Sequence, residues 1–265
     1  MSNKKYIDAH LHLQDDRFQF VREEVVKRAF ACGVAKMVCN AVCEKDWQEV
    51  AILAKQYISV VPCYGVHPWY AHQTTEGWLA RLESVVSEGG GIGEIGLDGT
   101  VEGSARRQED VFCAQLDLAA RTGKPVTIHC IKRWGRLLEI MNTFDLAASG
   151  ILLHSFGGSL ETLSRLLDLG AYASFSSCLA DPSREKMRQA FLQVPIDRLL
   201  LETDAPDQYS PYLIHEDPLP MDGEKRKISE PLHVVELYDF AAGLRKIDAD
   251  LFRQRLWDNG QIFTN

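Results

Sequence analysis

The sequence predicts an α/β protein built as a single (β/α)₈ TIM barrel, on three observations. Short apolar runs, turns and helical stripes recur about eight times along the 265 residues. The apolar runs are rich in Val, Ile, Leu and Ala and mostly unalternating, as expected of parallel strands buried on both faces. Eight such units suit a barrel of roughly 250 residues better than an open sheet. Because no linker or repeat interrupts the pattern, we expect residues 1–265 to form one domain.

The expected strands are short, and each ends at a turn. They cover residues 6–10, 35–40, 59–65, 91–95, 126–130, 151–154, 171–174 and 198–202. Leucines at helical spacing over residues 160–167 predict a helix that Ser159 caps and Gly170 ends. Asp181 and Pro182 are expected to open another helix, because proline at the first helical position commonly follows an acidic N-cap.

Composition excludes several classes of protein. With 46% hydrophobic and 25% charged residues, the chain is neither disordered nor fibrous. No stretch approaches the ~20 apolar residues of a membrane helix. The first residues show no apolar signal region and the seven cysteines are scattered, so we expect reduced thiols and a cytoplasmic protein. A net charge of −8 argues against a basic surface for nucleic acid, although bound cations or a basic patch would reverse the sign at one site.

The first candidate site residues are two histidines at the end of the first expected strand, in Asp8-Ala9-His10-Leu11-His12. Side chains two residues apart on a strand point to the same side, so both imidazoles share one face. Two nitrogen ligands on a rigid strand are a common way to hold a divalent transition metal. Taken alone, the pair is equally compatible with two exposed histidines at the start of a loop.

Four further metal-competent side chains end other expected strands. They are Glu94 on the fourth strand, His129 on the fifth, His154 on the sixth and Asp204 on the eighth. In a barrel, the carboxyl ends of all strands meet at one face, where such enzymes keep their active sites. Singly, each residue fits a buried structural histidine or a helix-capping acid better, but together they predict a metal site.

The number of ligands predicts two divalent metal ions. We expect His10, His12 and Asp204 to hold one ion, His129 and His154 to hold the other, and Glu94 to bridge them. Two ions about 3.5–4 Å apart activate a water for attack on phosphorus or a carbonyl and neutralise the developing charge. Glu94 and Asp204 are the expected catalytic residues, with Asp204 also accepting the proton of the attacking water.

Six ordered motifs across essentially the whole chain resemble those of the TatD-type metal-dependent hydrolases of the amidohydrolase superfamily. The motifs are Asp8-x-His10-x-His12, Gly65-Val66-His67-Pro68, Gly93-Glu94-Ile95-Gly96-Leu97-Asp98, Val126-x-Ile128-His129, His154-x-Phe156 and Glu202-Thr203-Asp204-Ala205-Pro206. The resemblance implies a phosphodiesterase, typically a deoxyribonuclease that trims single-stranded DNA from its 3′ end. It implies Mg²⁺, Mn²⁺ or Zn²⁺ as cofactor, and the ligand roles carry over position by position.

The chain departs from the family around the metal ligands. Gly99-Thr100 stands where aromatic residues usually follow the fourth strand, and Ile131 stands where an arginine usually follows the fifth. Ser155 and Gly157 replace a common cysteine and serine. The ligands are retained while the substrate contacts differ, so an amide, ester or lactone hydrolase acting on a small molecule is the alternative. A non-enzymatic binding module is a second, weaker one.

Three side chains near the ligands have two interpretations each. His67 either contacts the substrate or a metal-ligating side chain, or is a packing histidine at a turn. Glu202 either orients a metal ligand or is a buried structural acid. Asp98 either touches substrate or caps its loop.

The segment Gly91-Ile92-Gly93-Glu94-Ile95-Gly96 fits the dinucleotide-binding pattern GxGxxG. That motif requires the glycines to open a helix directly after a strand, with backbone amides against a pyrophosphate. Here the glycines overlap the expected strand, and Glu94 would place a carboxylate beside the phosphates. We therefore expect no nucleotide cofactor.

Residues 207–230 follow the last expected strand and should fold over the active face. They supply aromatic rings for stacking at positions 209, 212 and 215, and Lys225, Arg226 and Lys227 for phosphate. Lys132 and Arg133 are expected across the mouth. The alternative is an ordinary solvated loop. The remaining Trp, Phe and Leu residues are assigned to the core, and the sequence leaves the oligomeric state open.

Overall fold

The computed structural model describes residues 4–101, 103, 105–213 and 227–263 and contains eight parallel strands in the order β1 to β8. Their bounds are Tyr6–Leu11, Val34–Asn40, Val60–Tyr64, Gly91–Asp98, Val126–Ile131, Ile151–Leu153, Tyr172–Phe175 and Leu199–Leu201. The segment after β8 returns to β1, where the His12 amide donates to the Ala205 carbonyl at 2.7 Å. The strands therefore form a nearly closed barrel, and the predicted fold class is confirmed.

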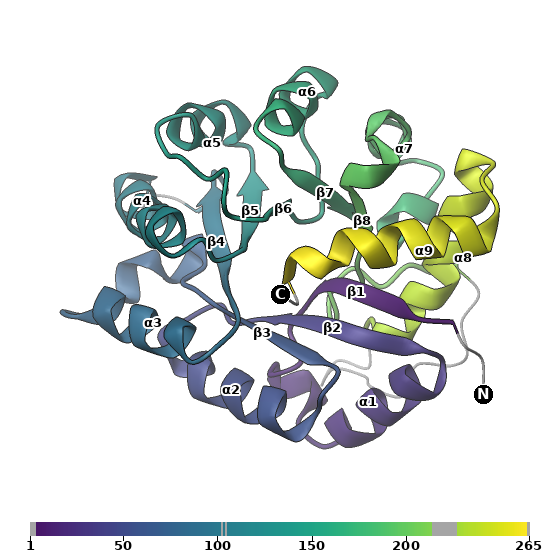
Figure 1. Cartoon of the computed structure of the whole chain (residues 1–265), viewed down its shortest axis with the longest axis horizontal. Coiled ribbons are helices and arrows are strands. Elements are labelled where there is room, and N and C mark those ends of the chain that lie inside the picture. Colours follow the sequence, from purple (N-terminus) through teal and green to yellow (C-terminus); the bar gives the residue numbers. More distant parts are fainter. Residues whose placement is uncertain (1–3, 102, 104, 214–226, 264–265) are drawn as a thin grey trace.

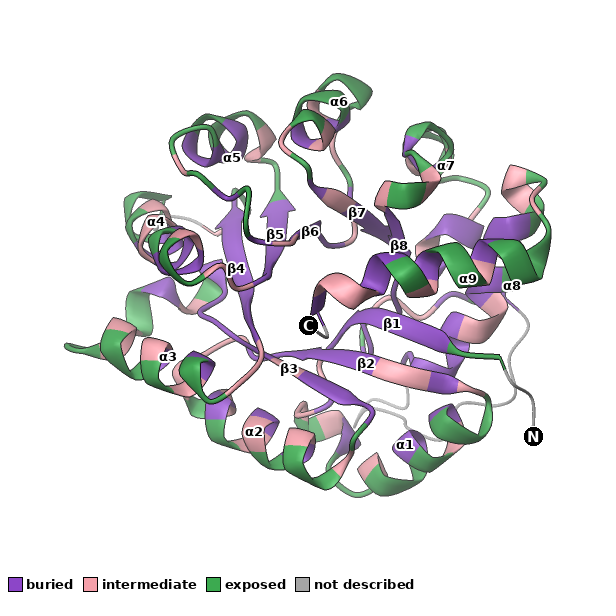
Figure 2. Ribbon diagram, in the orientation of Figure 1, coloured by how far each residue is buried: buried purple, intermediate pink, exposed green. Residues whose placement is uncertain are grey.

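Helices alternate with the strands and surround them (Figure 1). Their bounds, α1 to α9, are Arg22–Ala31, Trp47–Gln56, Trp78–Ser87, Ala105–Thr122, Trp134–Met141, Leu160–Asp168, Glu185–Gln193, Val234–Arg245 and Ala249–Asn259. Figure 2 shows buried strands and helices that are exposed on their outer side. No helix in the described ranges is long and apolar enough to cross a membrane.

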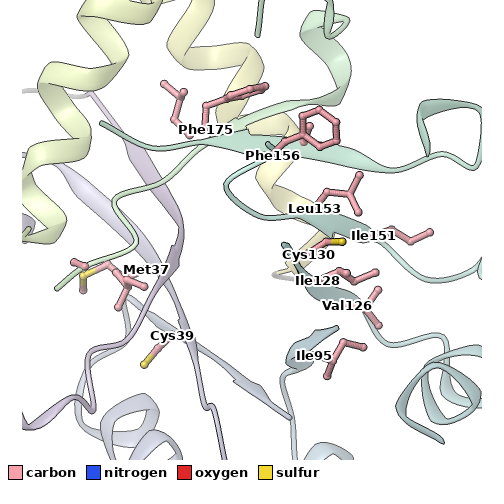
Figure 3. Packing of buried hydrophobic residues seen from close by; sticks show 14 of the residues in the cluster. Met37, Cys39, Ile95, Val126, Ile128, Cys130, Ile151, Leu153, Phe156 and Phe175 are labelled. Carbon is pink, nitrogen blue, oxygen red and sulfur yellow. The ribbon is translucent and has the colours of Figure 1, made fainter. Parts of the chain in front are cut away.

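Two apolar layers fill the space on either side of the strands. Figure 3 shows Ile95, Ile128, Leu153 and Phe175 in succession across β4 to β7, where they belong to the larger buried cluster. A smaller cluster of buried residues unites strand residues such as Ile7 with Phe263, the last residue that the structure describes.

Each of the eight expected strands overlaps an observed one, with β4 three residues longer than expected because it continues to Asp98. The cap of α6 is also confirmed, since the Ser159 side chain accepts the Thr162 amide. The prediction that Asp181 and Pro182 open a helix is wrong: α7 begins at Glu185. The Asp181 carboxylate instead accepts the Ser183 amide at 2.8 Å, which stabilises a turn before the helix.

Candidate metal centre

The six predicted ligands lie together at the carboxyl ends of the strands. His10 is on β1 with His12 directly after it, Glu94 is on β4, His129 is on β5, and His154 and Asp204 follow β6 and β8. All of them except the fully buried His10 line one cavity of about 530 Å³. These side chains and His67 form three groups of three residues. Within each group, the potential ligand atoms all lie within 4.8 Å of one another.

The first group is His10, His12 and Asp204. Asp204 Oδ1 lies 3.6 Å from His10 Nε2 and 3.5 Å from His12 Nε2. The loop after β8 is fixed against β1 by two contacts. The Asp204 amide donates to the His10 carbonyl at 3.0 Å, and the Asp8 carboxylate accepts the Thr203 amide at 2.9 Å. These backbone contacts hold the Asp204 carboxylate opposite the two imidazoles.

Glu94 takes part in both other groups, one with His10 and His154 and one with His67 and His129. Its Oε1 lies 2.8 Å from His154 Nε2 and 3.0 Å from His129 Nδ1. Its Oε2 lies 3.4 Å from His10 Nε2. The two oxygens of one carboxylate thus face the two sets of histidines, which is the arrangement a bridging ligand requires. His67 Nε2 is 3.5 Å from Oε1, so this histidine lies in the same cluster, and it also caps the 3₁₀ helix that follows it.

Outer contacts fix the orientation of three of the imidazoles. His12 Nδ1 donates to the Asn40 carbonyl at 2.8 Å, and His154 Nδ1 faces Glu202 Oε1 at 3.4 Å. His129 Nε2 faces Asp98 Oδ2 at 3.2 Å. Because each outer group accepts a hydrogen bond, the opposite ring nitrogen is the one that faces the cavity floor and could offer its lone pair to a metal ion.

Glu202 and Asp98 therefore both contact a candidate ligand. The Ser174 hydroxyl donates to Glu202, and this contact is compatible with both interpretations of the acid. Asp98 also accepts the Thr100 amide at 2.8 Å, so it caps its loop as well as holding His129.

The donor set fits divalent cations. His10 Nε2 and His12 Nε2 lie 3.2 Å apart, as do His129 Nδ1 and His154 Nε2. Lone pairs this close to one another and to carboxylates repel unless a proton or a metal ion lies between them. In addition, His10 Nδ1 has no hydrogen-bond partner among the described residues. Mixed imidazole and carboxylate ligands of this kind suit several divalent metals.

The cluster is strongly coupled electrostatically. Burial alone would raise the pKa of Glu94, but the surrounding histidines hold that pKa well below its usual range. Burial likewise opposes ionisation of Asp204, yet the hydrogen bond from His12 and neighbouring charges lower its pKa to about 2. For His12, burial is outweighed by Asp204 and Glu94, which raise the pKa to about 9. Burial dominates at His67 and lowers its pKa to about 3.

The rim of the cavity contains residues that sequence reasoning missed. Arg17 is the only lysine or arginine among the described residues that line the cavity. Its guanidinium pairs with Asp15 and Asp207, each at 2.9 Å, and so joins the loop after β1 to the loop after β8. Trp69 also lines the cavity, although the sequence pattern assigns tryptophans outside the motifs to the core. Both residues follow a strand end of the site by a few positions, which is the signal that could have found them.

The predicted basic contacts do not gather at the cavity. Neither Lys132, Arg133 nor Lys227 lines it, and Arg133 pairs with Glu109, another residue outside the cavity lining, at 2.5 Å. Lys225 and Arg226 lie outside the described residues, as does position 215.

The two tyrosines and the glycines that the sequence singled out do not line the cavity. Tyr209 packs against His233 with ring centroids 6.0 Å apart, and Tyr212 is exposed. The glycines of Gly91-Ile92-Gly93-Glu94-Ile95-Gly96 lie within β4, and the following helix α4 begins only at Ala105.

Comparison with known proteins agrees with the geometry. The family described as TatD related DNase matches residues 7–264. A protein named 3′-5′ ssDNA/RNA exonuclease TatD, from Edwardsiella piscicida, is 32% identical and covers 97% of this chain and 98% of its own length. An uncharacterized metal-dependent hydrolase of Escherichia coli, YjjV, is 28% identical, with 98% of each chain covered.

Solved structures show the same arrangement of the chain. The crystal structure of the Escherichia coli YjjV protein, a TatD homologue, superposes with a TM-score of 0.87 at 27% identity and covers 98% of both chains. A TatD family hydrolase from Entamoeba histolytica superposes with a TM-score of 0.85 at 20% identity, a likeness that concerns the fold. The chain belongs to the TatD related DNase family.

Proposed function

We propose that this protein is a divalent-metal-dependent phosphodiesterase that removes nucleotides from the 3′ end of single-stranded DNA. The observation that carries the proposal is the position of Glu94, whose two oxygens face His10 and His12 on one side and His129 and His154 on the other. Such a carboxylate is suited to bridging two cations. The relatives named 3′-5′ ssDNA/RNA exonuclease support the substrate.

Two divalent ions, Mg²⁺, Mn²⁺ or Zn²⁺, are the cofactors we propose. His10, His12 and Asp204 would hold one ion. His129 and His154, whose facing nitrogens are 3.2 Å apart, would hold the other, and Glu94 would contact both. When bound, a pair of ions lowers the pKa of water and neutralises charge that develops on phosphate oxygens.

Asp204 is the proposed proton acceptor. With its pKa lowered to about 2, its carboxylate is ionised at neutral pH. The Gln208 amide donates to Asp204 Oδ2 and helps to aim the carboxylate at the cavity. The water oxygen forms a bond to phosphorus, the bond to the 3′ oxygen of the penultimate nucleotide breaks, and Asp204 takes the water proton. A proton from Asp204 or from bulk water then neutralises the leaving 3′ oxygen. The products are a nucleoside 5′-monophosphate and a shortened strand with a 3′ hydroxyl.

The supporting groups hold the imidazole rings in the orientation in which they face the metal site. Asp98, Glu202 and the Asn40 carbonyl each contact the outer nitrogen of one histidine. Orientation by such partners raises ligand basicity and fixes the tautomer. We treat residues 1–265 as one catalytic domain, since the ligands come from β1 to the segment after β8. The seven free thiols support a reducing compartment, the cytoplasm.

The experiment that tests the proposed function is cleavage of a 5′-labelled single-stranded oligonucleotide by metal-stripped protein, with and without Mg²⁺, Mn²⁺ or Zn²⁺. We expect a ladder shortened from the 3′ end only when metal is present. Glu94→Ala, prepared in parallel, controls for contaminating nuclease. If protein with bound metal leaves the oligonucleotide intact, the phosphodiesterase is excluded, and a small ester, lactone or amide becomes the substrate class to assay.

A further inference from the structure

We propose that Trp69 and Ile131 form a subsite that holds the 3′-terminal base of the substrate by stacking and apolar contact. The role rests on the proposed nuclease activity. It adds a binding contact from two side chains that line the cavity and are not among the six predicted ligands.

Trp69 is an exposed aromatic side chain with a fixed orientation. It lies in the short 3₁₀ helix Pro68–Gln73 that follows β3. Its indole Nε1 donates to Asp98 Oδ2 at 2.7 Å, and its ring meets the His67 ring edge-on with centroids 5.0 Å apart. Its backbone amide donates to His67 Nδ1 at 3.2 Å.

Half of the Trp69 surface, 50%, nevertheless remains exposed, and the side chain lines the cavity. Because the one polar atom of the ring is already bonded to Asp98, what the side chain has left to offer a ligand is apolar surface. A ring already held in place loses little conformational entropy when a ligand stacks on it.

Ile131 extends the same wall. It pairs with Asp98 in the β4–β5 register, and its carbonyl accepts the Gly99 amide at 2.8 Å. Its side chain is 38% exposed and lines the cavity. Gly99 adds no side chain here, and a Cβ at this position would come within 3.2 Å of Lys132 Cβ and Arg133 Cγ.

Different parts of the cavity lining therefore suit different parts of a nucleotide. After β1 and β8, the Arg17 guanidinium lies between Asp15 and Asp207, whereas Trp69 after β3 and Ile131 at the end of β5 present an aromatic ring and an aliphatic chain. A planar base suits the apolar side, and every base has a face that can stack on an aromatic ring.

The apolar wall also lies next to the proposed reaction centre. Asp98 Oδ2 accepts from Trp69 Nε1 and faces His129 Nε2 at 3.2 Å, so one carboxylate oxygen joins the wall to a candidate ligand. A base on Trp69 would then be attached to a phosphate near Glu94 and His129. A cavity of about 530 Å³ is within the size range that encloses a single small ligand.

A purely structural role is the competing explanation, in which Trp69 only fixes Asp98. Two variants separate the roles. Trp69→Phe removes the hydrogen bond to Asp98 and keeps an aromatic face, whereas Trp69→Leu removes both. Phe20→Leu is the matched control, since Phe20 is 92% exposed and does not line the cavity.

The test compares two oligonucleotides that differ only at the 3′ terminus, one with a normal nucleotide and one with a stable abasic residue. We expect wild-type protein to prefer the normal end about tenfold in kcat/KM, as for the loss of one base–aromatic stack. Trp69→Phe should retain most of this preference even if both rates fall, and Phe20→Leu should retain all of it. Trp69→Leu should bring the ratio near one.

The subsite is contradicted if wild-type protein cleaves both oligonucleotides equally well, or if Trp69→Leu keeps the preference. If neither oligonucleotide is cleaved, the proposed nuclease activity fails, and fluorescence decides the subsite by itself. Titration of metal-free protein with dAMP should quench tryptophan emission, deoxyribose 5-phosphate should not, and Trp69→Phe should lose the quenching. Equal quenching in wild type and Trp69→Phe would overturn the assignment.

Discussion

The floor and the rim of the active cavity are built differently. On the floor, residues such as Glu94 and His129 lie on strands, are buried, and contact one another within 4 Å. On the rim, Arg17 and Trp69 lie in short 3₁₀ helices of the connections after β1 and β3, and both are partly exposed. The comparison indicates that the strands determine the metal chemistry, while the loops determine which substrate reaches it.

Removing a side chain from the floor should have the largest effect on activity. Glu94→Ala or His129→Ala should abolish metal-dependent cleavage while the circular dichroism spectrum remains that of the folded barrel. The loss should exceed the roughly 10- to 100-fold effect typical of an outer partner, because a ligand is removed. Glu109→Ala, which alters an acid outside the cavity, is the control. Full activity in both variants would refute the ligand assignment.

The next effect concerns a residue that acts through a ligand. Glu202→Gln should weaken metal binding about 10- to 100-fold, because Glu202 faces His154 Nδ1 and fixes that imidazole toward Glu94. Calorimetric titration of the metal-stripped protein measures this directly. Metal affinity equal to wild type would show that Glu202 is only a structural acid.

A substitution on the rim should have a smaller effect, and the effect should be on binding of the oligonucleotide. Arg17→Gln removes the one arginine of the described cavity lining and leaves Asp15 and Asp207 to repel a phosphate. We expect KM for the oligonucleotide to rise about fivefold, the factor that corresponds to about 1 kcal/mol, with little change in kcat. Arg17→Lys should recover part of the loss. A collapse of kcat instead would place Arg17 in the reaction itself.

The smallest effect is a pH dependence of stability in metal-free protein. The pKa of His12 is raised to about 9, so its protonated form favours folding. That contribution is complete below the unfolded value near 6.5 and is lost as pH rises through about 9. Tm should fall over this range, and the fall should be smaller in His12→Asn. The same slope in both proteins would contradict the assigned coupling to Asp204 and Glu94.

Sequence patterns predict the floor better than the rim, for a physical reason. Apolar runs mark buried parallel strands, and barrel geometry then brings their ends together, so the sequence alone is enough to group His10, His12 and Asp204. The direction of a loop side chain depends on partners distant in sequence. The sequence places Arg133 at the mouth, but Glu109 on α4 pairs with it elsewhere.

Two further disagreements between the sequence prediction and the structure also arise from contacts that the local sequence does not contain. Trp69 has the pattern of a core residue, but the Asp98 carboxylate, 29 positions later, holds its indole at the cavity wall. Asp181 and Pro182 match a helix start, but the Ser183 amide satisfies the carboxylate within a turn. In both cases a local pattern has two compatible structures, and a contact absent from that pattern selects one.

A metal titration of stripped protein, in which 3′-end cleavage of single-stranded DNA is followed, tests whether the site holds two ions. If Glu94 bridges two ions, activity should rise until two equivalents per chain are bound and then level off, and Glu94→Ala should stay inactive at any metal concentration. A plateau at one equivalent, or unimpaired cleavage by Glu94→Ala, would contradict the two-metal centre.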